Sequence, residues 1–307
     1  MTAISLLLGQ SLLVLVAAPF LNGVIKAVKA VFQGRRGPSV AQPAFDLLKY
    51  LARESVVSEH SSWIVRCAPL VYFVTSLAAA GLLPTFFDRP PLERLGDVVV
   101  LVGLLALGRF ALALAALDTA SNFGGMGTSR EMAFAALVEP ALLLALFALA
   151  IPVGSTAVAE VAGGPWGPAR LLALGALFIV AIAETGRIPV DNPDTHLELT
   201  MAHEGMILEY SGRALALVTW ASHIKQVVVV SLLAALFLPW GTAQQAQLGS
   251  LAVGVASYLG KLTVVGLALA LTETSYAKLR IFRVPDLLGA ASLLALLALI
   301  SGYVVGR

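Results

Sequence analysis

The stretch DVVVLVGLLALGRFALALAALD, residues 97–118, decides the fold. Between its two terminal aspartates it contains one charged residue, Arg109, and its apolar side chains do not alternate with polar ones. A helix needs about 20 apolar residues to cross the hydrocarbon core of a bilayer, whereas the strands of a membrane barrel are shorter and alternate. The stretch therefore predicts a membrane-spanning helix.

Seven other stretches repeat this pattern, so that eight spans are expected. They lie near residues 3–25, 67–87, 97–118, 131–152, 168–186, 211–238, 250–273 and 284–305. Over the whole chain 59% of the 307 residues are hydrophobic and 12% are charged, against about 25% charged residues in a soluble domain. We predict an all-α, polytopic membrane helix bundle in a lipid bilayer, formed as a single membrane domain by residues 1–307.

Lysine and arginine are distributed unequally over the loops between these spans. The even-numbered loops hold only Arg89, Arg94 and Arg170. The odd-numbered loops hold Lys26, Lys29, Arg35, Arg36, Lys49, Arg53, Arg66, Arg130, Arg187, Arg213, Lys278, Arg280 and Arg283. Because cytoplasmic loops are rich in Lys and Arg, the odd-numbered loops are expected in the cytoplasm and both termini on the other side of the cell (inner) membrane.

The first loop contains a segment, about residues 39–56, with an amphipathic pattern. Phe45, Leu48 and Ala52 recur at helical spacing with charged residues between them. The segment is too short and too charged to span, which predicts a helix in the membrane interface. Two interpretations stay open: a connector that lies on lipid, or a floor beneath a soluble partner.

The most informative segment, about residues 184–212, joins the fifth and sixth spans and carries six acidic residues and two of the four histidines. Pro189 and Pro193 interrupt any helix in its first half, and Asp194 and Glu198 stand four residues apart. Carboxylates at this spacing in a low dielectric raise each other's pKa and share protons. We interpret the segment as a proton relay that reaches a buried, water-filled cavity, and the alternative is a solvated acidic loop.

Isolated ionisable residues in the other spans add to this interpretation. Each costs about 2.5–3.5 kcal/mol on insertion scales, so each is a functional candidate. They are Arg109, Asp118, Glu139, Glu184, His223, Lys225, Lys261 and Glu273. Asp118, Lys225 and Glu273 have a second interpretation besides a functional role: they could lie near the membrane interface, where their charged groups reach water.

The sequence predicts no metal, nucleic-acid or catalytic site. His196 and His203 are seven residues apart and form no His-Glu-x-x-His motif. The single cysteine, Cys67, cannot hold an iron–sulfur cluster alone, and a net charge of +2 does not point to nucleic acid. Any redox centre is therefore expected on a partner.

Several motifs occur in order along the chain. Arg36-Gly37-Pro38 is followed by Gln42-Pro43 and Leu48-Lys49, residues 183–193 read Ala-Glu-x-x-Arg-x-Pro-x-Asp-x-Pro, and residues 209–212 read Glu-Tyr-Ser-Gly. Together with eight spans they resemble the complex I subunit 1 family and its homologues in membrane-bound, group 4 NiFe hydrogenases and formate hydrogenlyases.

Departures from the complex I pattern favour the hydrogenase-linked branch of that family. They include Val190, Asn192, Thr195 and His196, and the additional residues 201–204. The last odd-numbered loop, residues 277–288, is similar to the hydrogenase branch.

The resemblance implies a membrane anchor and ion-coupling subunit, not catalytic by itself, that links electron transfer in a soluble arm to translocation of protons or sodium ions. It implies hydrogenase large and small subunits, a ferredoxin-like iron–sulfur subunit and antiporter-like membrane subunits as partners, with the NiFe centre and iron–sulfur clusters on those partners. By position, the proton path would consist of Glu139, Glu184, Asp191, Asp194, Glu198 and Glu209. Residues that pair with the acids or tune them would be Arg187, His196, Glu204, Lys225 and Lys261. Residues that dock the soluble arm would be Arg35, Arg36, Gln42 and Lys49.

Other classes of function stay open at this point. The protein could be the quinone-site subunit of a proton-pumping NADH:quinone oxidoreductase, or a purely structural membrane anchor whose acids only form a docking surface. A free-standing transporter would be active alone, but the inverted pair of Gly/Pro-broken segments found in many transporters is not evident.

Overall fold

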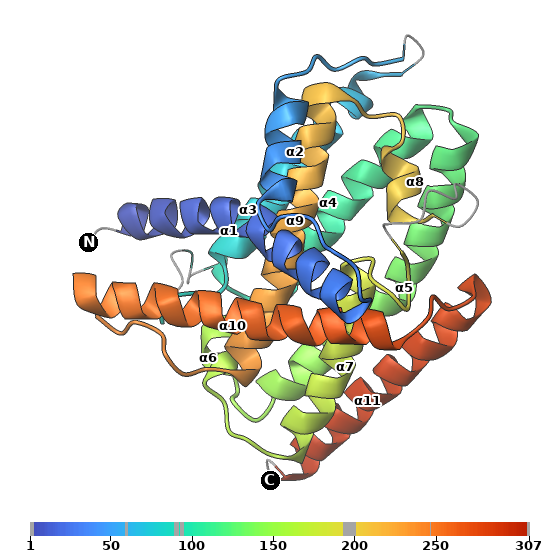
Figure 1. The fold of residues 1–307 in the computed structure, drawn as a ribbon. Coiled ribbons are helices and arrows are strands. Elements are labelled where there is room, and N and C mark those ends of the chain that lie inside the picture. The colour runs from blue at the N-terminus through green and yellow to red at the C-terminus, as the bar shows by residue number, and fades with distance from the viewer. Residues whose placement is uncertain are drawn as a thin grey trace.

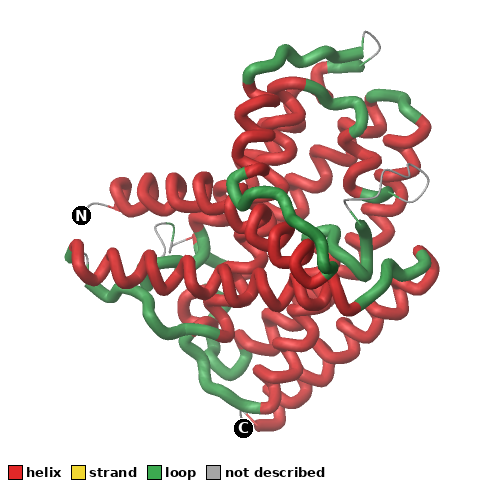
Figure 2. Tube along the Cα trace, in the orientation of Figure 1, coloured by secondary structure: helices red, strands yellow, loops and turns green. Residues whose placement is uncertain are grey.

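A computed structural model describes residues 3–58, 61–88, 92, 95–192, 201–245 and 247–305. These residues form helices joined by loops, with two isolated bridges and no sheet (Figures 1 and 2). The helices are α1 (Ala3–Phe32), α2 (Gln42–Leu51), α3 (Trp63–Gly81), α4 (Val98–Asp118), α5 (Asn122–Ala150), α6 (Val158–Ala162), α7 (Pro168–Glu184), α8 (His203–Ile207), α9 (Gly212–Phe237), α10 (Leu248–Ser275), the 3-10 helix η3 (Ile281–Arg283) and α11 (Val284–Val305).

Among the described residues, seven helices are long and apolar enough to cross a membrane: α1, α3, α4, α5, α9, α10 and α11. The eighth predicted span is α7, which has 17 residues and packs against α5 and α11. On α1 the outward residues Ile4, Leu8 and Leu12, four residues apart, are 64–70% exposed. Such an apolar outer stripe fits lipid, and the all-α membrane bundle is confirmed.

Three predicted span limits are wrong, of which the first is the end of α1 at Phe32 and not near residue 25. The second span ends at Gly81 and not near residue 87, because the next residues form a buried turn in which the Gln10 side chain donates to the Ala80 and Leu83 carbonyls at 2.7 and 3.0 Å. The fourth span begins at Asn122 and not near residue 131, since polar residues extend α5 beyond its apolar part.

Consecutive spans run antiparallel. The even-numbered loops meet on one face, where residues Phe87 and Ala243 form one bridge and Asp97 and Ala157 the other. The odd-numbered loops meet on the opposite face, where Val56 bonds to Ser211. We call these the even-loop face (residues 82–88, 92, 95–97, 151–167, 238–245 and 247) and the odd-loop face (residues 33–58, 61–62, 119–121, 185–192, 201–211 and 276–283). The alternation of the loops agrees with the sequence, and their cytoplasmic or external placement stays a prediction.

Helix α9 lies at the centre of the bundle. In its most apolar stretch of 18 residues, 89% of the residues are buried, against 28% in the corresponding stretch of α11. Helix α9 contacts α1, α2, α3, α7 and α10. Helices α1 and α10 lie side by side and cross the steeper helices at a large angle (Figure 1). With 30 residues, α1 is about 45 Å long, more than a bilayer core needs, so a strong tilt is expected.

The amphipathic segment forms α2, which is shorter than the predicted residues 39–56. Pro43 and Leu47 are buried against the bundle, whereas Phe45 and Leu48 are 59% and 62% exposed. The apolar face that the sequence singled out is therefore turned away from the rest of the protein, toward lipid or a partner.

The Tyr210-Ser211-Gly212 motif fastens the first loop to the start of α9. The Ser211 hydroxyl accepts from the Val56 amide at 2.8 Å and donates to the Val56 carbonyl at 3.1 Å. Gly212 has φ +51° and lies so close to Glu54 that a Cβ would be 2.1 Å from its carbonyl oxygen. Only glycine meets both conditions without a shift of the first loop.

Candidate functional site

An arginine in the middle of α4 is the centre of a first group of buried charges. Arg109 is 5% exposed. Its Nη1 lies 2.6 Å from Oε1 of Glu139 on α5, and its Nη2 donates to Oε1 of Glu184 at the end of α7. Glu131, also on α5, lies 3.7 Å from its Nε. One guanidinium thus contacts three carboxylates from two neighbouring helices.

Glu184 has a second cation on its other side. Nζ of Lys225 on α9 lies 2.8 Å from Oε2 of Glu184, and both residues are buried. We call Arg109, Glu131, Glu139, Glu184 and Lys225 the Arg109 cluster. When all five groups are ionised, three carboxylates face two cations, and the cluster has one excess negative charge that a single proton would neutralise.

The end of α7 places a second arginine just beyond this cluster. The Arg187 amide donates to the Ile182 carbonyl at 3.0 Å, and the Gly186 amide donates to Ala183 at 3.1 Å. Gly186 has φ +59°, so these bonds form a Schellman ending of the helix. The turn brings the Arg187 side chain back into the bundle, where it is 5% exposed.

Arg187 organises a second group of buried polar residues. Its Nη1 lies 2.9 Å from Oε1 of Glu273 on α10, and its Nη2 donates to Gln226 on α9 at 2.9 Å and to Asn22 on α1 at 3.3 Å. Lys29 Nζ lies 3.1 Å from the other Glu273 oxygen. We call Asn22, Lys29, Arg187, Gln226 and Glu273 the Arg187 cluster. Lys225 and Gln226 are consecutive, so the two clusters adjoin on α9.

Asp191 is the buried acid nearest to the odd-loop face. It is 5% exposed, and its Oδ1 lies 2.8 Å from Nζ of Lys278 in the last odd-numbered loop. Its Oδ2 accepts from the Ala202 amide at 3.2 Å. The last loop is held beside it because the Leu279 amide donates to the Pro189 carbonyl at 2.9 Å.

A cavity of about 560 Å³ lies between the acidic segment and α9. Arg187, Asp191 and Glu204 line it together with His223 and Gln226. The buried atoms His223 Nδ1 and Gln226 Nε2 have no hydrogen-bond partner among the described residues. A cavity of this size with such polar atoms can hold a chain of water molecules, which would connect Asp191 with the Arg187 cluster.

Three of the six predicted path residues and three of the five predicted pairing residues lie at the two clusters or at the large cavity. Glu139, Glu184 and Lys225 belong to the Arg109 cluster, and Asp191, Arg187 and Glu204 lie at the cavity. Glu209 is exposed on the odd-loop face, and Lys261 lies near the even-loop face, away from these acids. Asp194, His196 and Glu198 lie outside the described residues.

The predicted docking residues lie at the odd-loop face. Arg35 and Arg36 line a cavity of about 470 Å³ with Lys26 and Lys29, and the described lining contains no carboxylate. Gln42 and Lys49 are exposed on α2.

Some residues of the two clusters are not assigned to the site by the sequence. Glu131 falls at a predicted span limit, yet it stands eight residues before Glu139, a spacing that keeps both on one side of a helix. Lys29 falls in a predicted loop because the apolar run ends near residue 25, although α1 continues to Phe32. Glu273 stands out in the sequence only as an ionisable residue in a span.

Among the described residues, no group of three or more His, Cys, Asp or Glu side chains is arranged to hold a metal ion. The chemistry that the site offers is exchange of protons among carboxylates, with arginine and lysine as fixed counter-charges.

Comparison with known proteins places the chain in a family. Residues 4–303 match the family model described as NADH dehydrogenase. Formate hydrogenlyase subunit 4 of Escherichia coli K12 is 35% identical over 298 residues, which are 95% of this chain and 96% of the relative. Hydrogenase-4 component C of the same organism is 36% identical over 276 residues, 88% of this chain and 87% of the relative.

More distant relatives extend the family. A subunit of the NADH-quinone oxidoreductase of Anaplasma phagocytophilum is 29% identical over 252 residues, 73% of each protein. The fold is similar to that of one protein of the archaeal membrane-bound sulfane sulfur reductase, with a TM-score of 0.86 at 19% identity, covering 98% of this chain and 100% of that one. The chain therefore belongs to the NADH dehydrogenase family of membrane subunits, in which formate hydrogenlyase subunit 4 and hydrogenase-4 component C are relatives of similar length and NADH-quinone oxidoreductase subunits are more distant ones.

Proposed function

We propose that this protein is the membrane anchor and ion-coupling subunit of a group 4 NiFe hydrogenase or formate hydrogenlyase-type complex, in which it links electron transfer in a soluble arm to translocation of protons or sodium ions. One observation carries the proposal: ion pairs inside the bundle link Glu139 on α5, through Arg109 and Glu184, to Lys225 on α9, and the next residue of α9, Gln226, belongs to the Arg187 cluster. The two relatives above 30% identity, named as hydrogenlyase and hydrogenase components, support the choice of complex.

Stability alone gives little reason to keep these charges inside the bundle. Buried ion pairs gain less from their attraction than they lose on leaving water, and apolar replacements are often as stable. Ionisable residues inside membrane helices are rare, and those that occur commonly mark ion pathways and proton relays. Arg109 contacts both Glu139 and Glu184, so a proton on one carboxylate strengthens its pairing with the other. Such a competition can pass a change in charge from α7 to α5.

In this proposal, charge arriving in the soluble arm changes the protonation of the acids at the odd-loop face. Asp191 and Glu204 exchange protons through the water of the large cavity, and the proton passes on to Glu184, the neighbour of the lining residue Thr185. The Arg109 cluster then changes its pairing toward Glu139 and biases antiporter-like membrane subunits beside it.

The soluble arm would bind at the odd-loop face. The three cations Lys26, Arg35 and Arg36 line a cavity whose described lining contains no carboxylate, which suits an acidic partner. The exposed Phe45 and Leu48 of α2 would lie beneath that partner. Hydrogenase large and small subunits and a ferredoxin-like subunit are the proposed partners, and they would hold the NiFe centre and the iron–sulfur clusters.

The experiment that tests this proposal is Glu184→Gln in vesicles that contain the whole complex. The substitution keeps the shape of the side chain and removes the ability to carry a proton. We expect formation of the ion gradient to fall at least fivefold while hydrogen turnover continues. Glu160→Gln, which changes an exposed acid of α6 on the even-loop face, should leave both unchanged. A gradient that persists at the wild-type level in the Glu184→Gln vesicles would contradict the coupling role.

A further inference from the structure

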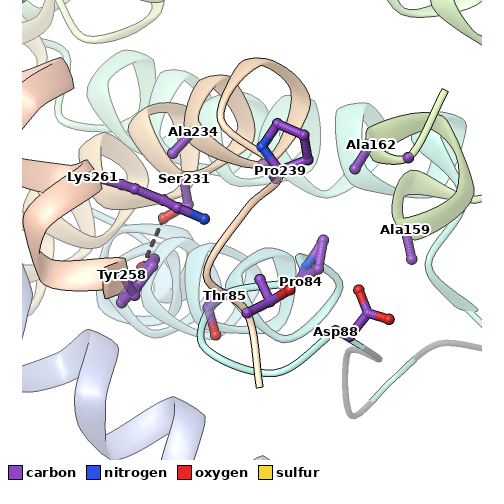
Figure 3. A pocket seen from close by; sticks show the side chains of 13 residues that line it. Pro84, Thr85, Asp88, Ala159, Ala162, Ser231, Ala234, Pro239, Tyr258 and Lys261 are labelled. Atoms are coloured by element: carbon purple, nitrogen blue, oxygen red, sulfur yellow. Dashed lines mark hydrogen bonds between the residues drawn. The ribbon is translucent and has the colours of Figure 1, made fainter. Parts of the chain in front are cut away.

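A separate cavity of about 90 Å³ lies near the even-loop face (Figure 3). Its walls come from α9, α10, α6 and the turn after α3. Polar lining residues are Thr85, Asp88, Ser231, Tyr258 and Lys261. Since about 10–15 Å³ of such space is enough for one water, the cavity has room for several.

Lys261 is the unusual member of this lining. It is only 8% exposed. It makes no hydrogen bond or ion pair with any residue that the structure describes, and Figure 3 shows its amine directed into the cavity. A buried ammonium group without a counter-charge is unfavourable unless water or proton loss relieves it.

The other polar groups suit a file of water. The hydroxyls of Ser231 and Tyr258 lie 2.8 Å apart, so one of them keeps a hydrogen to donate elsewhere. The buried Thr85 Oγ1 has no hydrogen-bond partner among the described residues. Asp88 is exposed where the lining reaches the surface.

The surrounding charges are few. Tyr258 and Asp88 are the other titratable residues of the lining. Arg170 on α7 donates a hydrogen bond to the carbonyl of the lining residue Ala162 at 2.6 Å, so its guanidinium group already has a partner outside the cavity. The charge nearest along α9 is Lys225, six residues or about 9 Å before Ser231.

An apolar layer separates this cavity from the Arg109 cluster. Between Lys225 and Ser231 on α9, Val227, Val228 and Val230 are at most 1% exposed. Water from the cavity therefore has no polar route along α9, and within the described residues the cavity communicates with the even-loop face.

We propose that this cavity is a hydrated proton-exchange site in which Lys261 and Asp88 trade a proton with the compartment at the even-loop face. The O–H bond of the protonated Asp88 carboxyl breaks, water carries the proton past Thr85 and Ser231, and an N–H bond forms on the Lys261 amine. The reverse step returns the proton to Asp88 and to the bulk. The use of this exchange in ion translocation rests on the proposed function, whereas the hydration of the cavity does not.

Hydration is tested by cysteine accessibility in vesicles that hold the whole complex, with Cys67→Ser as background. The membrane-impermeant trimethylammonium-ethyl methanethiosulfonate is added on the even-loop side and the modified peptide is measured by mass. We expect Lys261→Cys to react at least tenfold faster than Leu262→Cys, its 3% exposed neighbour on α10. Equal rates, or reaction only from the odd-loop side, would overturn the proposal. Thr85→Cys, which retains Lys261, tests the same cavity if the first variant does not assemble.

Proton exchange is tested by Lys261→Arg and Lys261→Met in the same vesicles, with gradient formation and hydrogen turnover as the readouts. Arginine keeps the positive charge and does not release its proton. We expect gradient formation to fall at least threefold in both variants while hydrogen turnover is retained. We expect Asp88→Asn to lower gradient formation as well. Rescue by arginine would show a structural cation and overturn the proposal. Wild-type vesicles that form no gradient would contradict the proposed function, and the accessibility result would still decide whether the cavity is hydrated.

Discussion

At the residue scale, Arg109 decides how the buried acids are paired. It bonds to Glu139 and Glu184 on two different helices and lies near Glu131. A planar guanidinium can serve several carboxylates at once, whereas a lysine ammonium is a compact point charge. Removing it would leave three acids with Lys225 as the only cation of their cluster.

We therefore expect Arg109→Gln to destabilise the subunit by about 3–5 kcal/mol, the usual cost of breaking a buried pair on one side. The measurement is thermal unfolding of the purified complex. Arg109→Lys should destabilise the subunit less than Arg109→Gln, because the positive charge remains. Arg66→Gln, which changes an exposed arginine of α3, is the control and should be neutral within about 0.5 kcal/mol. An Arg109→Gln protein as stable as this control would show that the cluster does not depend on its central cation.

At the element scale, the segment between α7 and α9 is fixed by its two ends. The Schellman turn at Gly186 aims Arg187 inward, and the Tyr210-Ser211-Gly212 motif bonds to the first loop. These two fixed ends hold Asp191 and Glu204 over the large cavity. The first loop is therefore bonded directly to the end of this segment that adjoins α9.

Gly212→Ala should disturb this connection. An alanine at φ +51° costs about 1–2 kcal/mol, and its Cβ would collide with the Glu54 carbonyl, so the first loop must shift. We expect faster proteolysis of residues 33–62 and a lower melting temperature. Gly249→Ala on α10 is the matched control, because a Cβ there meets nothing within 4 Å, and it should not accelerate cleavage. Unchanged proteolysis of Gly212→Ala would mean that the first loop is held by other contacts.

The helices could be predicted from the sequence because a bilayer demands long apolar runs, which are visible residue by residue. The limits of α3 and α5 could not, since the turn after Gly81 depends on Gln10 from a different helix and the polar start of α5 packs against α8. Arg109, Glu139 and Glu184 could be singled out as charges in apolar runs. Their pairing could not, because Arg109 and Glu184 are 75 residues apart and only helix packing brings them together.

At the scale of the whole molecule, the buried acids Glu184, Asp191 and Glu273 lie within the bundle or next to the face where the arm is proposed to bind. Asp191 is held by Lys278 and by the Ala202 amide, and so its own charge stabilises the joint between two odd-numbered loops. An ion-coupling subunit and a simple anchor make different predictions for Asp191.

Asp191→Asn tests that difference. If Asp191 carries protons, gradient formation should fall at least threefold while the soluble subunits still co-purify with the membrane part. If it only anchors the arm, the soluble subunits should be lost without a specific defect in coupling.

Measurement of nickel, quinone and subunit content in the same preparation also checks the assignment of the complex: nickel is expected, and bound quinone without nickel would favour the quinone-reducing alternative.

The antiparallel order of eight spans has a practical consequence for such preparations. The first residues of α1 and the last residues of α11 both emerge beside the even-numbered loops, opposite the basic surface at Arg35 and Arg36. If a soluble arm binds at the odd-loop face as proposed, an affinity tag or a fluorescent protein fused to either end would stand in the opposite compartment. Either fusion could thus report on assembly without crowding the joint that it is meant to observe.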